Sequence, residues 1–171
     1  MQRRRLLAAL GATSTAVLAG CLGSGDPGDG TETPTPEPCT VDRETPVDVE
    51  NEEIDVRELP EKPDEWTESS VETYVREYEA AYRQHKLYSA EMTSYGHSES
   101  TENIRQTDRG WRVELRTNFY WNEDTDDGNV HADSPYYTVV YLVADDRLLR
   151  AASEQHDADP SLDDATTLEC W

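Results

Sequence analysis

Nine successive residues in the second half of the chain alternate strictly between two kinds of side chain. One face would carry Trp111, Val113, Leu115, Thr117 and Phe119. The other face would carry Arg112, Glu114, Arg116 and Asn118. A period of two is the pattern of a β-strand with one buried face. We therefore expect a strand over residues 111–120, with its apolar face toward the core of an antiparallel sheet.

The neighbouring strands are marked less sharply. Residues 136–144 are nearly all apolar, which indicates a central strand covered on both faces or a strand at an interface. Residues 93–107 are polar and predict one irregular strand, and 148–153 predict a strand after a turn. We expect residues 122–133 to form an acidic loop and the tail after residue 153 to be irregular.

One long helix is predicted over residues 67–88. Its apolar face follows the helical period and is formed by Val71, Val75, Tyr78, Tyr82 and His85. Ser69 and Glu72 match a capping box, with Thr67 as an alternative cap. Glu79 and Arg83 are spaced as a helical ion pair.

A helix followed by about four antiparallel strands predicts an α+β fold, with the helix packed on the sheet. Before the helix, residues 40–63 predict one or two edge strands or an extended strap. This architecture resembles the cystatin-like and nuclear-transport-factor-like rolls, in which strands wrap one helix. Such a likeness implies nothing about activity.

The chain begins with a segment that is typical of an export signal. Arg3, Arg4 and Arg5 are followed by the short apolar stretch 6–17, which contains glycine, serine and threonine. The arginines resemble a twin-arginine signal. General secretion is an alternative, as is a transmembrane anchor, for which the apolar stretch is short.

Leu18, Ala19, Gly20 and Cys21 resemble a lipobox, in which the cysteine thiol receives a lipid and the chain is cut just before it. The stretch that follows is rich in glycine, threonine and proline and predicts a disordered linker. The predicted organisation is therefore a signal peptide (1–20), a lipidated cysteine with a linker (21–38) and one extracytoplasmic α+β domain (39–171).

Two further cysteines, Cys39 and Cys170, lie near the ends of the predicted domain. In an exported protein, an even number of remaining thiols favours a disulfide. We expect this pair to be bonded and to clasp the two ends of the domain; two free cysteines are the alternative.

The chain is strongly acidic, with 37 Asp and Glu against 15 Lys and Arg. Removal of the three N-terminal arginines would leave 12 basic residues and a net charge of −25. This charge excludes a nucleic-acid partner, which needs a basic surface. It resembles proteins of salt-loving archaea, because molar salt shortens the Debye length to about 3 Å and screens the self-repulsion.

The stretches 75–82 and 140–150 are similar to haloarchaeal lipoproteins that carry a twin-arginine-type signal and a lipobox. The similarity covers most of residues 60–153. It contains no catalytic motif and implies neither an activity nor a cofactor.

Four aromatic residues, Trp111, Phe119, Trp121 and Tyr136, gather in the predicted sheet. One hypothesis is that they line an apolar pocket in an open roll; the alternative is an ordinary core. No metal is expected, because Ser134 stands where the calcium template of the acidic loop needs a glutamate.

Together these patterns predict a lipid-anchored protein on the extracellular face of the cell membrane of a halophilic archaeon. We expect it to bind a protein or a small molecule without catalysis. The alternative is a small roll-shaped enzyme with an aromatic-lined pocket. No residue stands out as catalytic.

Overall fold

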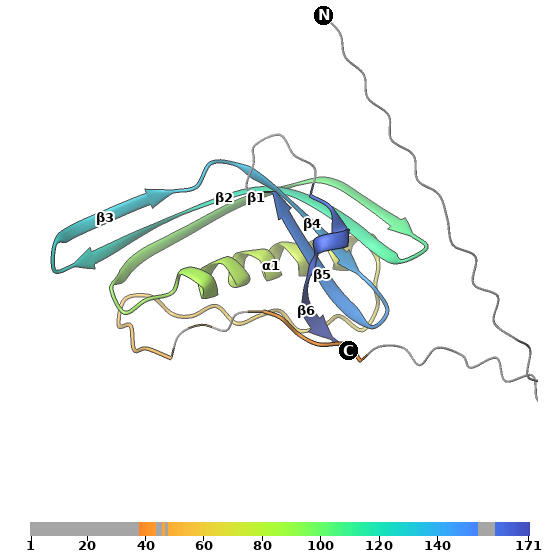
Figure 1. The fold of residues 1–171 in the computed structure, drawn as a ribbon, viewed down its shortest axis with the longest axis horizontal. Coiled ribbons are helices and arrows are strands. Elements are labelled where there is room, and N and C mark those ends of the chain that lie inside the picture. The colour runs from red at the N-terminus through yellow and green to blue at the C-terminus, as the bar shows by residue number, and fades with distance from the viewer. Residues whose placement is uncertain (1–37, 44–45, 47, 154–159) are drawn as a thin grey trace, which may run out of the picture. The chain divides into compact units, whose positions relative to one another are not determined.

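The computed structural model describes residues 38–43, 46, 48–153 and 160–171. Within them the fold is α+β, with one helix against an antiparallel sheet of six strands that does not close (Figure 1). The elements are α1 (Glu68–Leu87), β1 (Met92–Thr107), β2 (Gly110–Thr125), β3 (Gly128–Asp133), β4 (Tyr137–Val143), β5 (Arg147–Ser153), the 3-10 turn η1 (Leu162–Asp164) and β6 (Thr166–Cys170).

The predicted export signal, the lipobox and Cys21 lie outside the described residues, as does the linker up to residue 37. In the part of the chain that the structure does describe, no helix has the length and apolar character needed to cross a bilayer.

Helix α1 begins where Thr67 satisfies free backbone N–H groups of the first turn. The Thr67 hydroxyl accepts a hydrogen bond from the Ser70 backbone N–H at 3.2 Å, and the Ser70 hydroxyl accepts one from the Thr67 N–H at 2.9 Å. The predicted box starting at Ser69 is wrong, because Ser69 already lies inside the first turn. The predicted apolar face is buried along its whole length.

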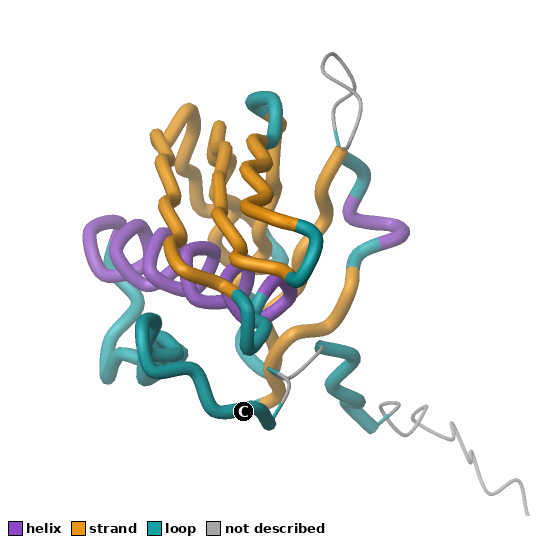
Figure 2. The backbone as a smooth tube through the Cα atoms, turned by 90° about the vertical axis from the view of Figure 1, so that its left-hand side faces the viewer, coloured by secondary structure: helices purple, strands orange, loops and turns teal. Residues whose placement is uncertain are grey.

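The rest of the sheet is assembled on β2. One edge of β2 pairs with β1, and the other edge is shared between β4, opposite Trp111–Thr117, and β3, opposite Tyr120–Thr125. At the junction, the Ser134 N–H donates to the Phe119 carbonyl at 2.8 Å, and the Phe119 N–H donates to the Ser134 hydroxyl at 2.9 Å. The strand order is β1-β2-β4-β5-β6. The β2–β3 hairpin extends past the end of α1 (Figure 1), and the helix lies across one side of the sheet (Figure 2).

The predictions for the apolar strands are confirmed as β4 and β5, but the expected total of about four strands was an undercount. The polar stretch 93–107 pairs with β2 along almost all its length, because backbone hydrogen bonds do not require apolar side chains. The expected acidic loop folds back as β3, since Gly128 supplies the positive φ of the tight turn. The tail pairs with β5 as β6.

The described residues between 40 and 63 form a strap and contain no strand. The strap runs beside the end of α1 and satisfies polar side chains that it buries. The Gln84 amide accepts from the Arg57 backbone N–H at 2.7 Å and donates to the Asp55 carbonyl at 3.1 Å. His85 Nε2 lies 2.6 Å from the Arg57 carbonyl oxygen.

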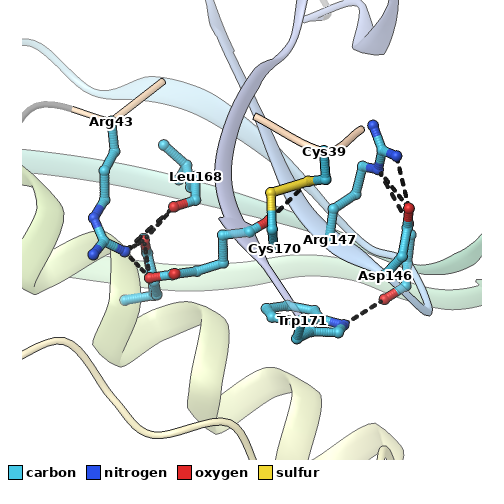
Figure 3. The surroundings of a disulfide bond; sticks show 10 residues. Cys39, Arg43, Asp146, Arg147, Leu168, Cys170 and Trp171 are labelled. Atoms are coloured by element: carbon cyan, nitrogen blue, oxygen red, sulfur yellow. Dashed lines mark hydrogen bonds and ion pairs between the residues drawn. A yellow bond between two sulfur atoms is a disulfide. The ribbon is translucent and has the colours of Figure 1, made fainter. Parts of the chain in front are cut away.

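A disulfide joins Cys39, at the start of the strap, to Cys170, at the end of β6, as predicted (Figure 3). Close by, Arg43 forms an ion pair with Glu169 and donates to the Leu168 carbonyl at 3.3 Å. The two ends of the domain are therefore held together by a covalent bond and by polar contacts.

The core lies between α1 and the sheet. It consists of Val71, Tyr74, Val75, Tyr78, Tyr82, Val113, Leu115, Tyr137, Val139, Tyr141, Val143, Leu148 and Leu168. Tyrosines are frequent in it, and two of them, Tyr137 and Tyr141, direct their hydroxyl groups at one buried carboxylate, described below.

Two glycines with positive φ provide a matched test of the turns. A Cβ at Gly110 (φ 126°) would lie 2.1 Å from the Val143 carbonyl oxygen, whereas one at Gly128 (φ 120°) would meet nothing within 4 Å. We expect Gly128→Ala to lower the free energy of unfolding by about 1–3 kcal/mol through backbone strain. Gly110→Ala should lower it by clearly more, because the β2–β4 pairing must also move. Denaturant unfolding in molar salt measures both, and equal losses would contradict the steric argument.

Candidate functional site

A single carboxylate is fully buried between α1 and the sheet. The Glu79 side chain has no exposed surface. It accepts hydrogen bonds from Arg150 Nε at 2.7 Å, Arg150 Nη2 at 2.9 Å, Arg83 Nε at 3.1 Å, the Tyr141 hydroxyl at 2.5 Å and the Tyr137 hydroxyl at 3.1 Å. These bonds satisfy a buried charge that would otherwise be very costly.

The helical and strand periods explain why these groups converge. Arg83 follows Glu79 by one helical turn. Tyr137 and Tyr141 are four residues apart on β4, so both side chains point to the same face of the sheet. Arg150 is the partner of Tyr141 in the β4–β5 register. The network can therefore form only when α1, β4 and β5 are assembled.

The pKa of Glu79 reflects a contest between burial and charge. Burial by itself would raise this pKa, but the charge and hydrogen bonds of Arg150 oppose it, with help from Arg83 and the Tyr141 hydroxyl. The outcome is a pKa lowered from 4.5 to about 2. Glu79 therefore remains a carboxylate at neutral pH.

Two of the cations that hold Glu79 also line a pocket of about 340 Å³. The lining comes from α1, β5, η1 and β6 and consists of Tyr82, Arg83, Lys86, Arg150, Ala151, Ala152, Ser161, Asp164 and Thr166. Aromatic rings hold both guanidinium groups in place. The Arg150 guanidinium lies 4.8 Å from the centre of the Tyr82 ring, and that of Arg83 lies 4.8 Å from the centre of the Tyr137 ring.

Both arginines keep hydrogen-bond donors beyond those used on Glu79. Among the described residues, Arg150 Nη1 and both Nη atoms of Arg83 have no protein acceptor. Only Thr101 Oγ1 and Asn118 Oδ1 are fully enclosed polar side-chain atoms without a partner in the described part of the chain. The spare guanidinium nitrogens are therefore not sealed in the core, and they can donate to an anion.

Three basic side chains of the described residues, Arg83, Lys86 and Arg150, line this pocket. Arg83 and Arg150 share the carboxylate of Glu79, and Lys86 lies over the Tyr82 ring. In a chain with 15 Lys and Arg against 37 Asp and Glu, three basic residues at one pocket are informative. Because the cations are fixed by rings and by a carboxylate, an anion would bind there with little further ordering of side chains.

A second pocket, of about 370 Å³, is lined by the strap, α1 and β1 and contains His97. His97 Nδ1 lies 2.9 Å from Glu99 Oε2, and Nε2 lies 2.8 Å from the Thr117 hydroxyl. Burial lowers the pKa of His97 in spite of the nearby charges of Glu79 and Glu99. Both ring nitrogens already have protein partners, so His97 is poorly placed to exchange a proton with a ligand.

The four residues predicted to line an aromatic pocket are separated in the structure. Phe119 and Trp121 stack, with ring centres 5.9 Å apart. Trp111 also packs against the core, but it lies eight residues before Phe119 on β2. This separation corresponds to roughly 27 Å along an extended strand. Tyr136 is 44% exposed and lies beside Arg116, on the face of the sheet away from α1. They do not share one pocket, because strand alternation and distance place them apart.

The acidic segment that resembles a calcium loop is the end of β2 and its turn into β3. In the described part of the chain, no cluster of three or more His, Cys, Asp or Glu side chains is arranged to hold a metal ion.

Glu79 and Arg150 were not predicted to be site residues. Glu79 was interpreted only as the partner of Arg83, although it sits between Tyr78 and Tyr82 on the buried arc of the helix. Arg150 is the only charged residue in the otherwise apolar stretch 148–152. Each of these charges interrupts an apolar pattern, one on the helix and one in the strand. A buried charge needs a partner, so this was the signal in the sequence that the two side chains lie together.

Comparisons of the chain with protein-family models, with curated proteins and with solved structures find no match.

The lowered pKa of Glu79 has a measurable consequence. The native state holds the charged form more strongly than the unfolded chain, so its stabilising effect is complete above pH 4.5 and is lost as the pH falls toward 2. This linkage is worth on the order of 3 kcal/mol. We expect Glu79→Gln to lower the free energy of unfolding near pH 7 by about 3–5 kcal/mol, because Arg150 loses its buried partner.

The same substitution should remove the contribution of Glu79 to acid destabilisation. The free energy of unfolding of the variant should therefore fall less steeply than that of the wild type between pH 4.5 and 2. Glu77→Gln, at an exposed position of the same helix, is the control and should change neither quantity appreciably. Denaturant titrations across this pH range test both variants. Parallel profiles for the wild type and E79Q would contradict the assignment.

Proposed function

We propose that this protein is a lipid-anchored, extracytoplasmic domain of a salt-loving archaeon that binds a small anionic ligand without transforming it. The observation that carries the proposal is the pair of guanidinium groups, Arg83 and Arg150, fixed on one buried carboxylate and lining one pocket. Their spare nitrogens offer the geometry that carboxylate and phosphate oxygens bind best.

A high-salt environment is compatible with an anion site on an acidic protein. In molar salt the Debye length is about 3 Å, so the negative surface repels an approaching anion only at close range. Inside the pocket, direct hydrogen bonds from ordered guanidinium groups are screened less than exposed charges are. The pocket volume of about 340 Å³ lies within the usual range for small-molecule sites.

Binding is favoured over catalysis by the way the polar side chains are used. The histidine that faces a pocket, His97, has both nitrogens engaged by Glu99 and Thr117. Glu79 is enclosed and holds cations. The alternative of a small enzyme draws its main support from the lowered pKa of His97 beside a pocket. The likeness of the fold to the cystatin-like or nuclear-transport-factor-like rolls is proposed as an architectural analogy, and it implies no activity.

The anchoring part of the proposal rests on the arginines at positions 3–5 and on the lipobox ending in Cys21. We expect the protein extracted from native membranes to have the non-reduced mass of residues 21–171 plus a lipid, less two hydrogens for the Cys39–Cys170 bond. Intact-protein mass spectrometry measures this. A mass that retains residues 1–20 and lacks a lipid would refute the anchor.

The two lysines of the chain allow a matched test of the anion site. Lys86 lines the pocket, whereas Lys62 lies over the Trp171 ring, outside the pocket lining. We expect Lys86→Met to weaken binding of a carboxylate probe, glucuronate, by roughly three- to tenfold, the effect of one charged hydrogen-bond donor. Lys62→Met removes the same charge and should leave binding within about twofold.

Calorimetric titration at constant ionic strength measures these affinities, and thermal unfolding checks that both variants are folded. Equal effects of the two substitutions would mean that only the overall charge matters, which would overturn the proposed site.

A further inference from the structure

The rest of the polar lining of this pocket has a different chemistry. It is formed by Ser161 and Asp164, from the η1 turn, and by Thr166, at the start of β6. Thr166 is the register partner of Arg150 in the β5–β6 pairing, so the two side chains lie on the same face of the sheet. The pocket is therefore lined by basic groups and also by hydroxyl and carboxylate oxygens.

Asp164 is the most informative of these oxygen-bearing residues. It is exposed and forms no ion pair with the pocket cations, and no other partner occurs among the described residues. Ser161 accepts a hydrogen bond from the Asp163 backbone N–H at 3.2 Å, which leaves its own hydroxyl hydrogen available. An unpaired carboxylate beside cations would repel a simple anion, yet it is a strong acceptor for hydroxyl groups.

We propose that the ligand is a hydroxylated organic anion of the sugar-acid class. Its acidic group would bind Arg83, Lys86 and Arg150, and its hydroxyl groups would bind Asp164, Ser161 and Thr166. This inference rests on the proposed anion site and adds the identity of the ligand class. A pocket of about 340 Å³ has room for more than an inorganic ion.

The arrangement also explains how such a site would work in concentrated salt. A purely cationic pocket would be occupied by the abundant inorganic anion. The charge of Asp164 repels every anion. Only a ligand that donates hydroxyl hydrogen bonds to Asp164 compensates this repulsion, so the site selects such ligands over inorganic anions.

Three probes of similar ring size separate charge from hydroxylation: glucuronate has both, cyclohexanecarboxylate has only the charge, and glucose has only the hydroxyl groups. We expect glucuronate to bind the full mature protein at least about tenfold more tightly than either of the others, as the loss of one or two charge-assisted hydrogen bonds would give. Titration calorimetry or ligand-observed NMR at fixed salt measures the three affinities.

Two aspartate substitutions separate the effect of a hydrogen-bond acceptor from that of overall charge. Asp164→Ala should weaken glucuronate by roughly tenfold but strengthen cyclohexanecarboxylate, because it removes both an acceptor and a repulsive charge. Asp163→Ala is the control: Asp163 is also exposed but does not line the pocket, so it should shift both anions slightly in the same direction. Thermal unfolding confirms that each variant is folded.

The outcomes distinguish the two proposals. Equal binding of glucuronate and cyclohexanecarboxylate, or parallel effects of the two aspartate substitutions, would overturn the sugar-acid inference while leaving the anion site intact. Binding of glucose as tight as that of glucuronate, or no binding of either anion, would overturn the anion site itself.

Discussion

The buried pair of Glu79 and Arg150 is the interaction on which the rest of the domain depends. A buried ion pair adds little net stability over an apolar substitute, but loss of one partner leaves the other charge stranded. The pair therefore acts mainly as a constraint on the fold. A one-residue slip of β5 against β4 would turn Arg150 to the opposite face of the sheet, and a rotation of α1 would withdraw Glu79, so both are strongly disfavoured.

The same carboxylate links the core to the pocket. Arg83 and Arg150 repel each other, and Glu79 allows both to line one small pocket by accepting hydrogen bonds from each. The tyrosine hydroxyl groups beneath it complete the coordination of the carboxylate without adding charge. One carboxylate thus connects the packing of the core with the guanidinium groups at the pocket, and it accounts for the tyrosines at positions 137 and 141.

The sequence predicted those parts of the fold that depend on local periodicity. The helix face from Val71 to His85 and the apolar strand at 137–143 follow from spacing alone. The irregular strand expected at 93–107 is confirmed as β1, but β3 and β6 were not predicted, because polar strands pair through backbone groups that side-chain patterns do not reveal. The site of Glu79 and Arg150 was not predicted, for a related reason. The two residues are 71 positions apart in the sequence, and only the β4–β5 register brings them together.

The covalent link between Cys39 and Cys170 has a consequence for the fate of a damaged molecule. The bond closes a ring that contains every helix and strand of the described domain. If a protease cuts the backbone once at an exposed turn, such as the tip of the β2–β3 hairpin, both fragments remain joined through the two sulfur atoms. Within this ring, a single nick releases no part of the domain, and two cuts are needed to free a piece of chain from the covalent framework.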